Sequence, residues 1–427
     1  MESKMGKDRI WDEVINIIEQ DRQDLVDLCL QLGRIPSPPG KERAVGQAVI
    51  DWLKANDIKA YLQPITEESV NAIGLIPGIG DGSSLILDAH IDAGVGPVGG
   101  PVPDSETERR NQTGWVDGEL IYGTGIINCK AQVAAFMIAA RALKKTGVRL
   151  KGDLTIAAVA FETGAASVDE FEGIKYPGEG FGSKWLVDRG VTADYALIGE
   201  TSEFGIVTSE CGYVQLKIRI KGRNVYTPRL ERGSLWQENP NAFAKAAHVV
   251  LALEDWAIKY EQRECLETSG GVIIPKSQII SMRGGRWGDV DSSSCSIYLD
   301  VWLAPGANPR AIKKEIEDLI RKLKVECEIT VYQWGRGYIA KNAGPMINAI
   351  KVAHRYVLGS EPVIPPSPVL SMWRDMNVFN EVGIPSVCYG AARQKEPFTD
   401  SQNRAMKISD LVAATKVYAL VAISLCG

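Results

Sequence analysis

Four side chains suited to metal binding or to acid–base chemistry stand at the ends of three short apolar runs. His90 and Asp92 close the first run, Glu162 follows the second, and Glu200 closes the third. Imidazole nitrogens and carboxylate oxygens bind divalent transition metals, and carboxylates also serve as general bases. The chain has only three histidines, so any metal site in it cannot be rich in imidazole.

The three runs, 84–90, 153–160 and 195–200, are short and apolar, which predicts buried strands, and a helix is expected over 128–145. Strands that alternate with helices predict an α/β sheet with many parallel strands. Ligands of such sheets bind beyond the carboxyl ends of the strands, where all four side chains stand.

From about residue 208 the pattern changes to period two, which is typical of half-exposed antiparallel strands. Strands are expected at 213–220, 278–282, 295–303 and 328–333, with helices at 241–262 and 309–323. This order fits a small ferredoxin-like α+β domain inserted into the first domain. The chain then returns to α/β character, with 385–389 as a last inner strand before a long C-terminal helix.

The composition narrows the classes of partner. Hydrophobic residues make up 45% of the 427 residues and the net charge is −5, which argues against nucleic acid or an anionic membrane as a partner. No apolar leader begins the sequence, and its eight cysteines form no close pairs. We therefore expect a cytoplasmic protein with reduced thiols.

An ordered series of motifs covers nearly the whole chain and resembles a known family of enzymes. The series resembles the acetylornithine deacetylase, succinyl-diaminopimelate desuccinylase and carboxypeptidase G group of metallopeptidases. Its pieces are the entry loop 32–42, the H-x-D segment 88–95, the Y-G-x-G segment 122–130, the segments 161–164 and 198–200, and the late segment 374–385.

The resemblance implies a two-domain architecture and a metal-dependent hydrolase. It implies an aminopeptidase-like mixed-sheet catalytic domain at 1–207 and 335–427, with a ferredoxin-like lid and dimerisation domain at 208–334. A homo-oligomer, dimer or larger, follows from pairing through the lid. In the family, two metals share a bridging Asp, and this chain matches the pattern at His90 and Glu200 as ligands, Asp92 as the residue that orients the histidine, and Glu162 as the general base.

Several family positions hold other residues here. Asn128 stands at the bridging Asp, Thr163 at a second-metal Glu, Asp400 at the late metal-binding His, and Tyr226 at the lid-domain His. Because Asn and Thr supply no charge, we expect one weakly held divalent metal (Mn, Zn or Co), bound by His90 and Glu200 with Asn128 in or near its shell. Asn128 as a plain helix cap stays open, as does direct ligation by Asp400.

The altered site favours a substrate that supplies its own electrophilicity. The predicted reaction is the hydrolytic deamination of 5-nitroanthranilate to 5-nitrosalicylate and ammonia, because the nitro group takes up the negative charge and no oxyanion-binding His is needed. Arg374 is expected to bind the carboxylate of this aromatic substrate and Tyr226 to line the pocket. The alternatives are a mononuclear N-acyl-amino-acid deacylase and a non-catalytic relative. Cys129 is interpreted as a small buried apolar residue.

Overall fold

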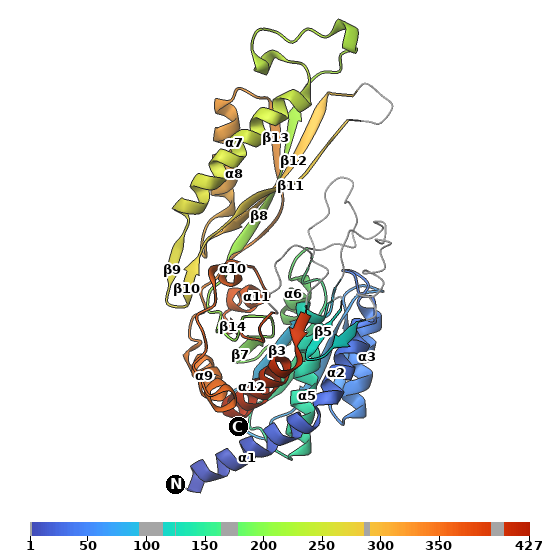
Figure 1. The fold of residues 1–427 in the computed structure, drawn as a ribbon, viewed down its shortest axis with the longest axis vertical. Coiled ribbons are helices and arrows are strands. Elements are labelled where there is room, and N and C mark those ends of the chain that lie inside the picture. Colours follow the sequence, from blue (N-terminus) through green and yellow to red (C-terminus); the bar gives the residue numbers. More distant parts are fainter. Residues whose placement is uncertain (1, 94–113, 124, 164–177, 286–290, 394–404) are drawn as a thin grey trace. The chain divides into compact units, whose positions relative to one another are not determined.

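The computed structural model describes residues 2–93, 114–123, 125–163, 178–285, 291–393 and 405–427. By its internal contacts the chain divides into two compact units. The larger unit comprises residues 1–208, 340–365 and 374–427, and the smaller unit comprises residues 209–339 and 366–373. Figure 1 shows the fold coloured along the sequence.

The larger unit is built on a six-stranded mixed sheet with the order β1-β2-β6-β3-β7-β14. In this sheet β3, β6, β7 and β14 run parallel, whereas β1 and β2 are antiparallel to their neighbours. The strands are β1 (Lys59–Pro64), β2 (Val70–Ile76), β3 (Leu85–His90), β6 (Leu154–Val159), β7 (Tyr195–Ile198) and β14 (Ser386–Cys388). A small sheet of order β15-β5-β4 joins β15 (Ala405–Lys407), β5 (Leu120–Tyr122) and β4 (Trp115–Asp117).

Helices cover both faces of the six-stranded sheet. Alternate residues of β3 divide between the two faces: Leu85, Leu87 and Ala89 join the main apolar core, while Asp88 bonds to Ser183 of α6. The core face carries α5 and α12, which pack against each other, and α6 and α11 cover the other face. The helices are α1 (Glu2–Gln20), α2 (Arg22–Gly33), α3 (Arg43–Ala55), α5 (Ala131–Lys145), α6 (Phe181–Asp188), α9 (Gly344–Leu358), α11 (Met376–Glu381) and α12 (Ile408–Cys426).

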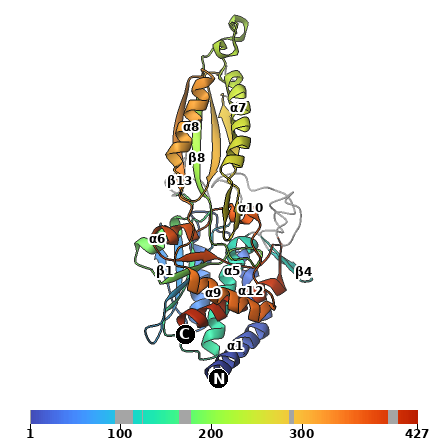
Figure 2. The same cartoon turned by 90° about the vertical axis from the view of Figure 1, so that its left-hand side faces the viewer.

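The smaller unit is a four-stranded antiparallel sheet of order β11-β12-β8-β13 with two helices. The chain order, strand–helix–strand–strand–helix–strand, together with this strand order, is the ferredoxin-like arrangement that the sequence predicted. Figures 1 and 2 show α7 and α8 along the sheet, and apolar residues of both helices share its core. The elements are β8 (Gly212–Lys221), α7 (Ala242–Arg263), β11 (Ser277–Gly284), β12 (Ser294–Leu303), α8 (Pro309–Lys322) and β13 (Cys327–Gly335).

Both long helices of the smaller unit begin at an asparagine. The side chain of Asn241 accepts from the backbone N–H groups of Phe243 and Ala244, and Asn308 accepts from that of Arg310. Such caps satisfy backbone donors that have no partner inside the helix. The unit also contains a short hairpin, β9 (Leu266–Thr268) with β10 (Gly271–Ile273).

The bounds of the two units differ from the predicted domains at three places. Residue 208, predicted in the lid domain, falls in the larger unit. Residues 335–339 and 366–373, predicted to belong to the first domain, pack with the smaller unit. The segment 366–373 contains α10 (Ser367–Leu370), and its Ser371 hydroxyl accepts from the N–H of Ile274 at 2.8 Å. The carbonyl of Met372 accepts from Cys211, so tertiary hydrogen bonds decide the allocation.

Two predicted elements are corrected. The helix expected from Asn128 begins at Ala131, because Asn128 and Cys129 have non-helical backbone angles in a short turn, Ile126–Lys130. The strand β14, predicted as an inner strand, is the last strand of the described six-stranded sheet, where it pairs with β7, and its Cys388 also forms an isolated antiparallel bridge with Val207.

Two helical stretches, Ile126–Lys145 and Ile408–Cys426, are long and apolar enough to pass as membrane spans by composition. In the fold, 94% and 67% of their apolar windows are buried. The core helix of a folded domain has the same composition, so this test gives only weak evidence of a membrane span.

Candidate active site

The candidate site lies at the carboxyl ends of three adjacent parallel strands of the larger unit. His90 is the last residue of β3, Glu162 follows β6, and Glu200 follows β7. The three strands are neighbours in the order β6-β3-β7, so the side chains that follow them converge. The positional prediction from the sequence is therefore confirmed for these elements.

His90 is held in one orientation and is 1% exposed. Its Nδ1 lies 2.9 Å from the carbonyl oxygen of Asp92 and 3.4 Å from the Asp92 carboxylate. Its Nε2 has no hydrogen-bond partner among the described residues, although the Glu162 carboxylate is 3.5 Å away. A buried imidazole fixed through one nitrogen and open at the other is the arrangement found in metal-binding histidines.

Asp92 is a fully buried anchor for the loop after β6. Its carboxylate accepts from the backbone N–H of Glu162 at 3.0 Å and from that of Thr163 at 2.8 Å, and the Thr163 hydroxyl also donates to it. Asp92 therefore sets the positions of both His90 and Glu162. Thr163, at the position where the family supplies a second-metal carboxylate, is used to hold Asp92.

Glu200 is 3% exposed and is anchored by a cation. The Nε of Arg374, a fully buried side chain, donates to Glu200 Oε2 at 2.8 Å. The preceding Gly199 admits no side chain, because a Cβ there would lie 2.3 Å from the ring of Phe136 on α5. Close packing of Gly199 on Phe136 of α5 thus fixes the backbone from which Glu200 projects.

Cys129 joins this cluster, which the sequence analysis did not foresee. Among the described residues, one group of possible metal ligands has its atoms within 4.8 Å of one another: His90, Cys129 and Glu200. The thiol of Cys129 also lies 3.5 Å from the amide oxygen of Asn128. The non-helical turn directs both residues toward the site, and their position in the Y-G-x-G segment is the only sequence signal for it.

The electrostatics of the cluster favour a bound cation. Burial raises the pKa of Glu162 well above its usual range; His90 opposes this rise and the carboxylates of Glu200, Asp375 and Asp92 add to it. Burial alone would lower the pKa of His90, but Cys129, Glu162 and Asp92 carry it well above its ordinary value. Buried acids without enough positive charge beside them either bind protons or bind a metal.

Asp88 and Asp375 form a further pair of buried carboxyls in the larger unit. Ser183 donates to Asp375 at 2.8 Å and to Asp88 at 3.3 Å, and each carboxyl has one buried oxygen without a partner among the described residues. Burial raises the pKa of Asp375 to about 7. A shared proton satisfies such a pair at neutral pH, so we interpret it as a structural contact between β3, α6 and the start of α11.

The structure brings together six of the seven residues named from the sequence as a site, and the seventh, Tyr226, belongs to the smaller unit. His90, Asp92, Asn128, Glu162 and Glu200 cluster in the larger unit. Arg374 joins this cluster through its ion pair with Glu200, and its binding of a substrate carboxylate stays a prediction. Tyr226 is 64% exposed in the smaller unit. Asp400 lies outside the described residues.

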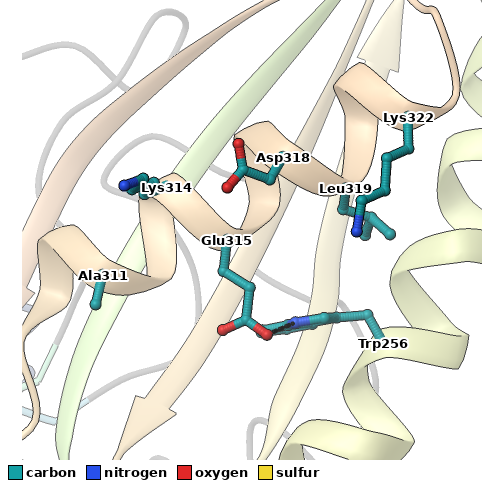
Figure 3. A pocket seen from close by; sticks show the side chains of 7 residues that line it. All are labelled: Trp256, Ala311, Lys314, Glu315, Asp318, Leu319 and Lys322. Carbon is teal, nitrogen blue, oxygen red and sulfur yellow. Dashed lines mark hydrogen bonds between the residues drawn. The ribbon is translucent and has the colours of Figure 1, made fainter.

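The smaller unit has a surface groove of about 390 Å³ between α7 and α8. Figure 3 shows the Glu315 carboxylate beside the ring of Trp256. Glu315 accepts from Trp256 Nε1 at 2.9 Å and pairs with Arg263 at 2.8 Å, so its charge is already satisfied. This groove contains none of the candidate site residues.

The α/β fold and the strand-end cluster of imidazole, thiol and carboxylates are those of a metal-dependent hydrolase. The family model for peptidase family M20/M25/M40 matches residues 86–424. The chain therefore belongs to this family, and the resemblance seen in its motifs is confirmed.

Individual relatives are distant in sequence but similar over their length. An N-formyl-4-amino-5-aminomethyl-2-methylpyrimidine deformylase of Halalkalibacterium halodurans is 22% identical over 96% of each chain. A succinyl-diaminopimelate desuccinylase of Hahella chejuensis is 24% identical over 66% of this chain and 68% of its own length. The solved YXEP protein of Bacillus subtilis, described as a dinuclear metal-binding peptidase, matches with a TM-score of 0.64 at 15% identity, covering 96% of this chain and 99% of its own.

The residues present fit one metal ion of this family. The open Nε2 of His90, the Cys129 thiol and the Glu200 carboxylate form a compact donor set of nitrogen, sulfur and oxygen. Asn128 and Thr163, which stand where the family resemblance implies metal-binding carboxylates, carry no charge.

Proposed function

We propose that this chain is an amidohydrolase that cleaves a C–N bond in a small molecule with one divalent transition metal. The observation that carries the proposal is the convergence of His90, Glu162 and Glu200 at one sheet edge. The deformylase and desuccinylase relatives act on N-acyl groups of small molecules, which supports the class of bond.

In the proposed reaction His90 and Glu200 hold the metal, which when bound would lower the pKa of water and polarise the substrate. Glu162 removes a proton from the attacking water and later delivers it to the departing nitrogen. Asp92 keeps both His90 and Glu162 in position through the hydrogen bonds described above. Arg374 fixes the carboxylate of Glu200.

The deamination of 5-nitroanthranilate is a second candidate function. It is favoured by one observation: Asn128 and Thr163 leave the second metal position of the family without charged ligands. A nitro group para to the amine stabilises the addition intermediate itself, so less polarisation by the protein is needed. An aromatic carboxylate as substrate and Tyr226 as a pocket residue belong to this proposal.

A substrate panel tests the two candidates against each other. The panel contains the N-formyl aminomethylpyrimidine, N-succinyl-diaminopimelate, an N-acetyl amino acid, 5-nitroanthranilate and anthranilate. Release of an acyl acid from any of the first three supports the amidohydrolase. Release of ammonia from 5-nitroanthranilate, with anthranilate inert, supports deamination instead, and no turnover of any compound with metal added supports a non-catalytic relative.

Glu162→Gln tests the proposed base in either reaction. We expect kcat to fall by about a hundred- to ten-thousandfold, because general bases contribute about that much, while metal content stays unchanged. An exposed glutamate, Glu67→Gln, is the matched control and should retain full activity. A Glu162→Gln variant with wild-type kcat rejects this residue as the base.

We also propose a cytoplasmic homodimer, paired through the smaller unit. Supporting this, Leu251 and Ile258 are 65% and 60% exposed. They stand seven positions apart on α7 and therefore lie on one face of the helix.

A further inference from the structure

Cys129 lies where a third metal ligand is needed. Its side chain is fully buried, and its sulfur lies within 4.8 Å of ligand atoms of both His90 and Glu200. For zinc with Zn–S near 2.3 Å and Zn–N near 2.0–2.1 Å, tetrahedral ligand atoms are roughly 3.5 Å apart. The three atoms would therefore have to approach by at most about 1.3 Å, which side-chain rotation can supply.

A second observation points to an ion at the same place. The Nε2 of His90 is buried and has no hydrogen-bond partner among the described residues. Its other ring nitrogen is held by Asp92, and a ring nitrogen of His90 belongs to the ligand group with Cys129 and Glu200. A buried polar atom is rarely left unpaired unless a ligand, ion or water satisfies it.

The backbone explains why the sulfur reaches the site. Cys129 has φ −132° and ψ 20° in the turn before α5, whereas the helix begins only at Ala131. In a continued helix the side chains of Asn128 and Cys129 would diverge by about 100°. The irregular turn instead brings the thiol to the ligand group and leaves it 3.5 Å from the Asn128 amide oxygen.

We propose that Cys129 binds the metal as a thiolate, together with His90 and Glu200, in place of the carboxylate that the family supplies at position 128. This inference rests on the proposed function and makes it more specific. A mixed nitrogen, sulfur and oxygen set suits zinc or cobalt, whereas manganese and magnesium prefer oxygen ligands. Of the three metals expected from the sequence, zinc and cobalt are therefore favoured over manganese.

Cobalt(II) substitution tests this ligand directly by spectroscopy. The wild-type protein loaded with one equivalent of cobalt should show a near-ultraviolet sulfur-to-cobalt charge-transfer band. Cys129→Ser and Cys129→Ala should lose the band, and their zinc affinity should fall by more than the roughly 10–100-fold that loss of an outer-shell partner costs. Cys29→Ala, the same change at another fully buried cysteine, should keep the band and the affinity.

The outcomes separate this inference from the proposed function. If wild-type protein binds one cobalt without the charge-transfer band, Cys129 is not a ligand, and the single-metal hydrolase still stands. If the band persists in both Cys129 variants, another thiol is responsible and the inference is wrong. If no cobalt binds at all, both proposals fall. The first and third outcomes are read on wild-type protein alone, so they hold even if a variant does not fold.

Discussion

At the scale of single residues, the site is a set of buried acids organised by Asp92. Asp92 holds His90 through its carbonyl oxygen and holds the loop of Glu162 and Thr163 through its carboxylate. It also affects Glu42, a fully buried glutamate whose Oε1 accepts from the N–H of Gly40 at 2.7 Å. Burial, with the charge of Asp92, raises the pKa of Glu42 to about 7.

The raised pKa of Glu42 predicts a fall in stability with rising pH. The folded protein binds the Glu42 proton more tightly than the unfolded chain, whose pKa is near 4.5. The stabilisation is therefore complete below about pH 4.5 and is lost as the pH rises toward 7, amounting to about 3 kcal/mol. The free energy of unfolding of the metal-free protein, measured with urea between pH 5 and 8, should show this fall.

The Glu42→Gln variant should remove this fall, because its amide stays uncharged and its oxygen still accepts from Gly40. Glu67→Gln, on the exposed loop nearby, should leave the pH profile of the wild type in place. An unchanged profile in Glu42→Gln would show that other groups cause the pH dependence.

The sequence revealed residues whose place depends on strand order but not those that depend on local backbone geometry. His90, Glu162 and Glu200 were found because the carboxyl ends of parallel strands meet at one edge. Cys129 was missed because its direction depends on the irregular turn, which periodicity cannot show. The partner of Arg374 was also missed, since a contact between residues 174 apart in sequence is set by tertiary packing alone.

At the scale of elements, the contact between the turn after β7 and α5 determines where Glu200 stands. Gly199 lies against the ring of Phe136, and its N–H donates to the carbonyl of Asp88 on β3 at 2.8 Å. The ring of Phe136 also meets Tyr418 of α12 edge-on, with centroids 4.7 Å apart. The helices α5 and α12 and the sheet edge that carries the site therefore belong to one packed core.

Gly199→Ala should disturb this packing. We expect a loss of about 1–3 kcal/mol in the free energy of unfolding, as in other overpacked cores, and weaker metal binding, because Glu200 follows directly. The double variant Gly199→Ala with Phe136→Leu lacks the ring atoms that the added methyl group would meet. It should therefore recover part of the lost free energy of unfolding and part of the lost metal binding. Gly344→Ala, where a methyl group meets open space, is the control and should have little effect. Wild-type stability in Gly199→Ala would show that the contact is not tight.

At the scale of the whole molecule, the chain separates a site-bearing unit from a ferredoxin-like unit. Hydrophobic periodicity predicted the four parallel strands of the larger unit and the strand and helix order of the smaller unit, and with them the fold class, but not the antiparallel strands β1 and β2. The boundary between the two units was less predictable. Residues 366–373 belong to the smaller unit, to which they are joined by hydrogen bonds such as that from the N–H of Ile274 to the hydroxyl of Ser371. Such tertiary bonds leave no periodic signal in the sequence.

Pairing through the smaller unit predicts a dimer in solution. Light scattering coupled to gel filtration should give twice the mass of one chain for the wild type. Leu251→Asp with Ile258→Asp should give monomers, because two charges would be buried on the shared face of α7. Ile79→Asp, at a 66% exposed position of the larger unit, should remain dimeric. A monomeric wild type would contradict the proposed assembly.

The number of metal ions per chain tests the central claim most directly. Protein equilibrated with zinc or cobalt, dialysed free of excess and analysed by inductively coupled plasma mass spectrometry should hold one ion per chain, which a mild chelator removes. Restoring the family carboxylates with Asn128→Asp and Thr163→Glu together should raise the count toward two. One ion in the wild type, lost in His90→Ala, is the predicted result; two tightly held ions, or none, in the wild type would contradict the account.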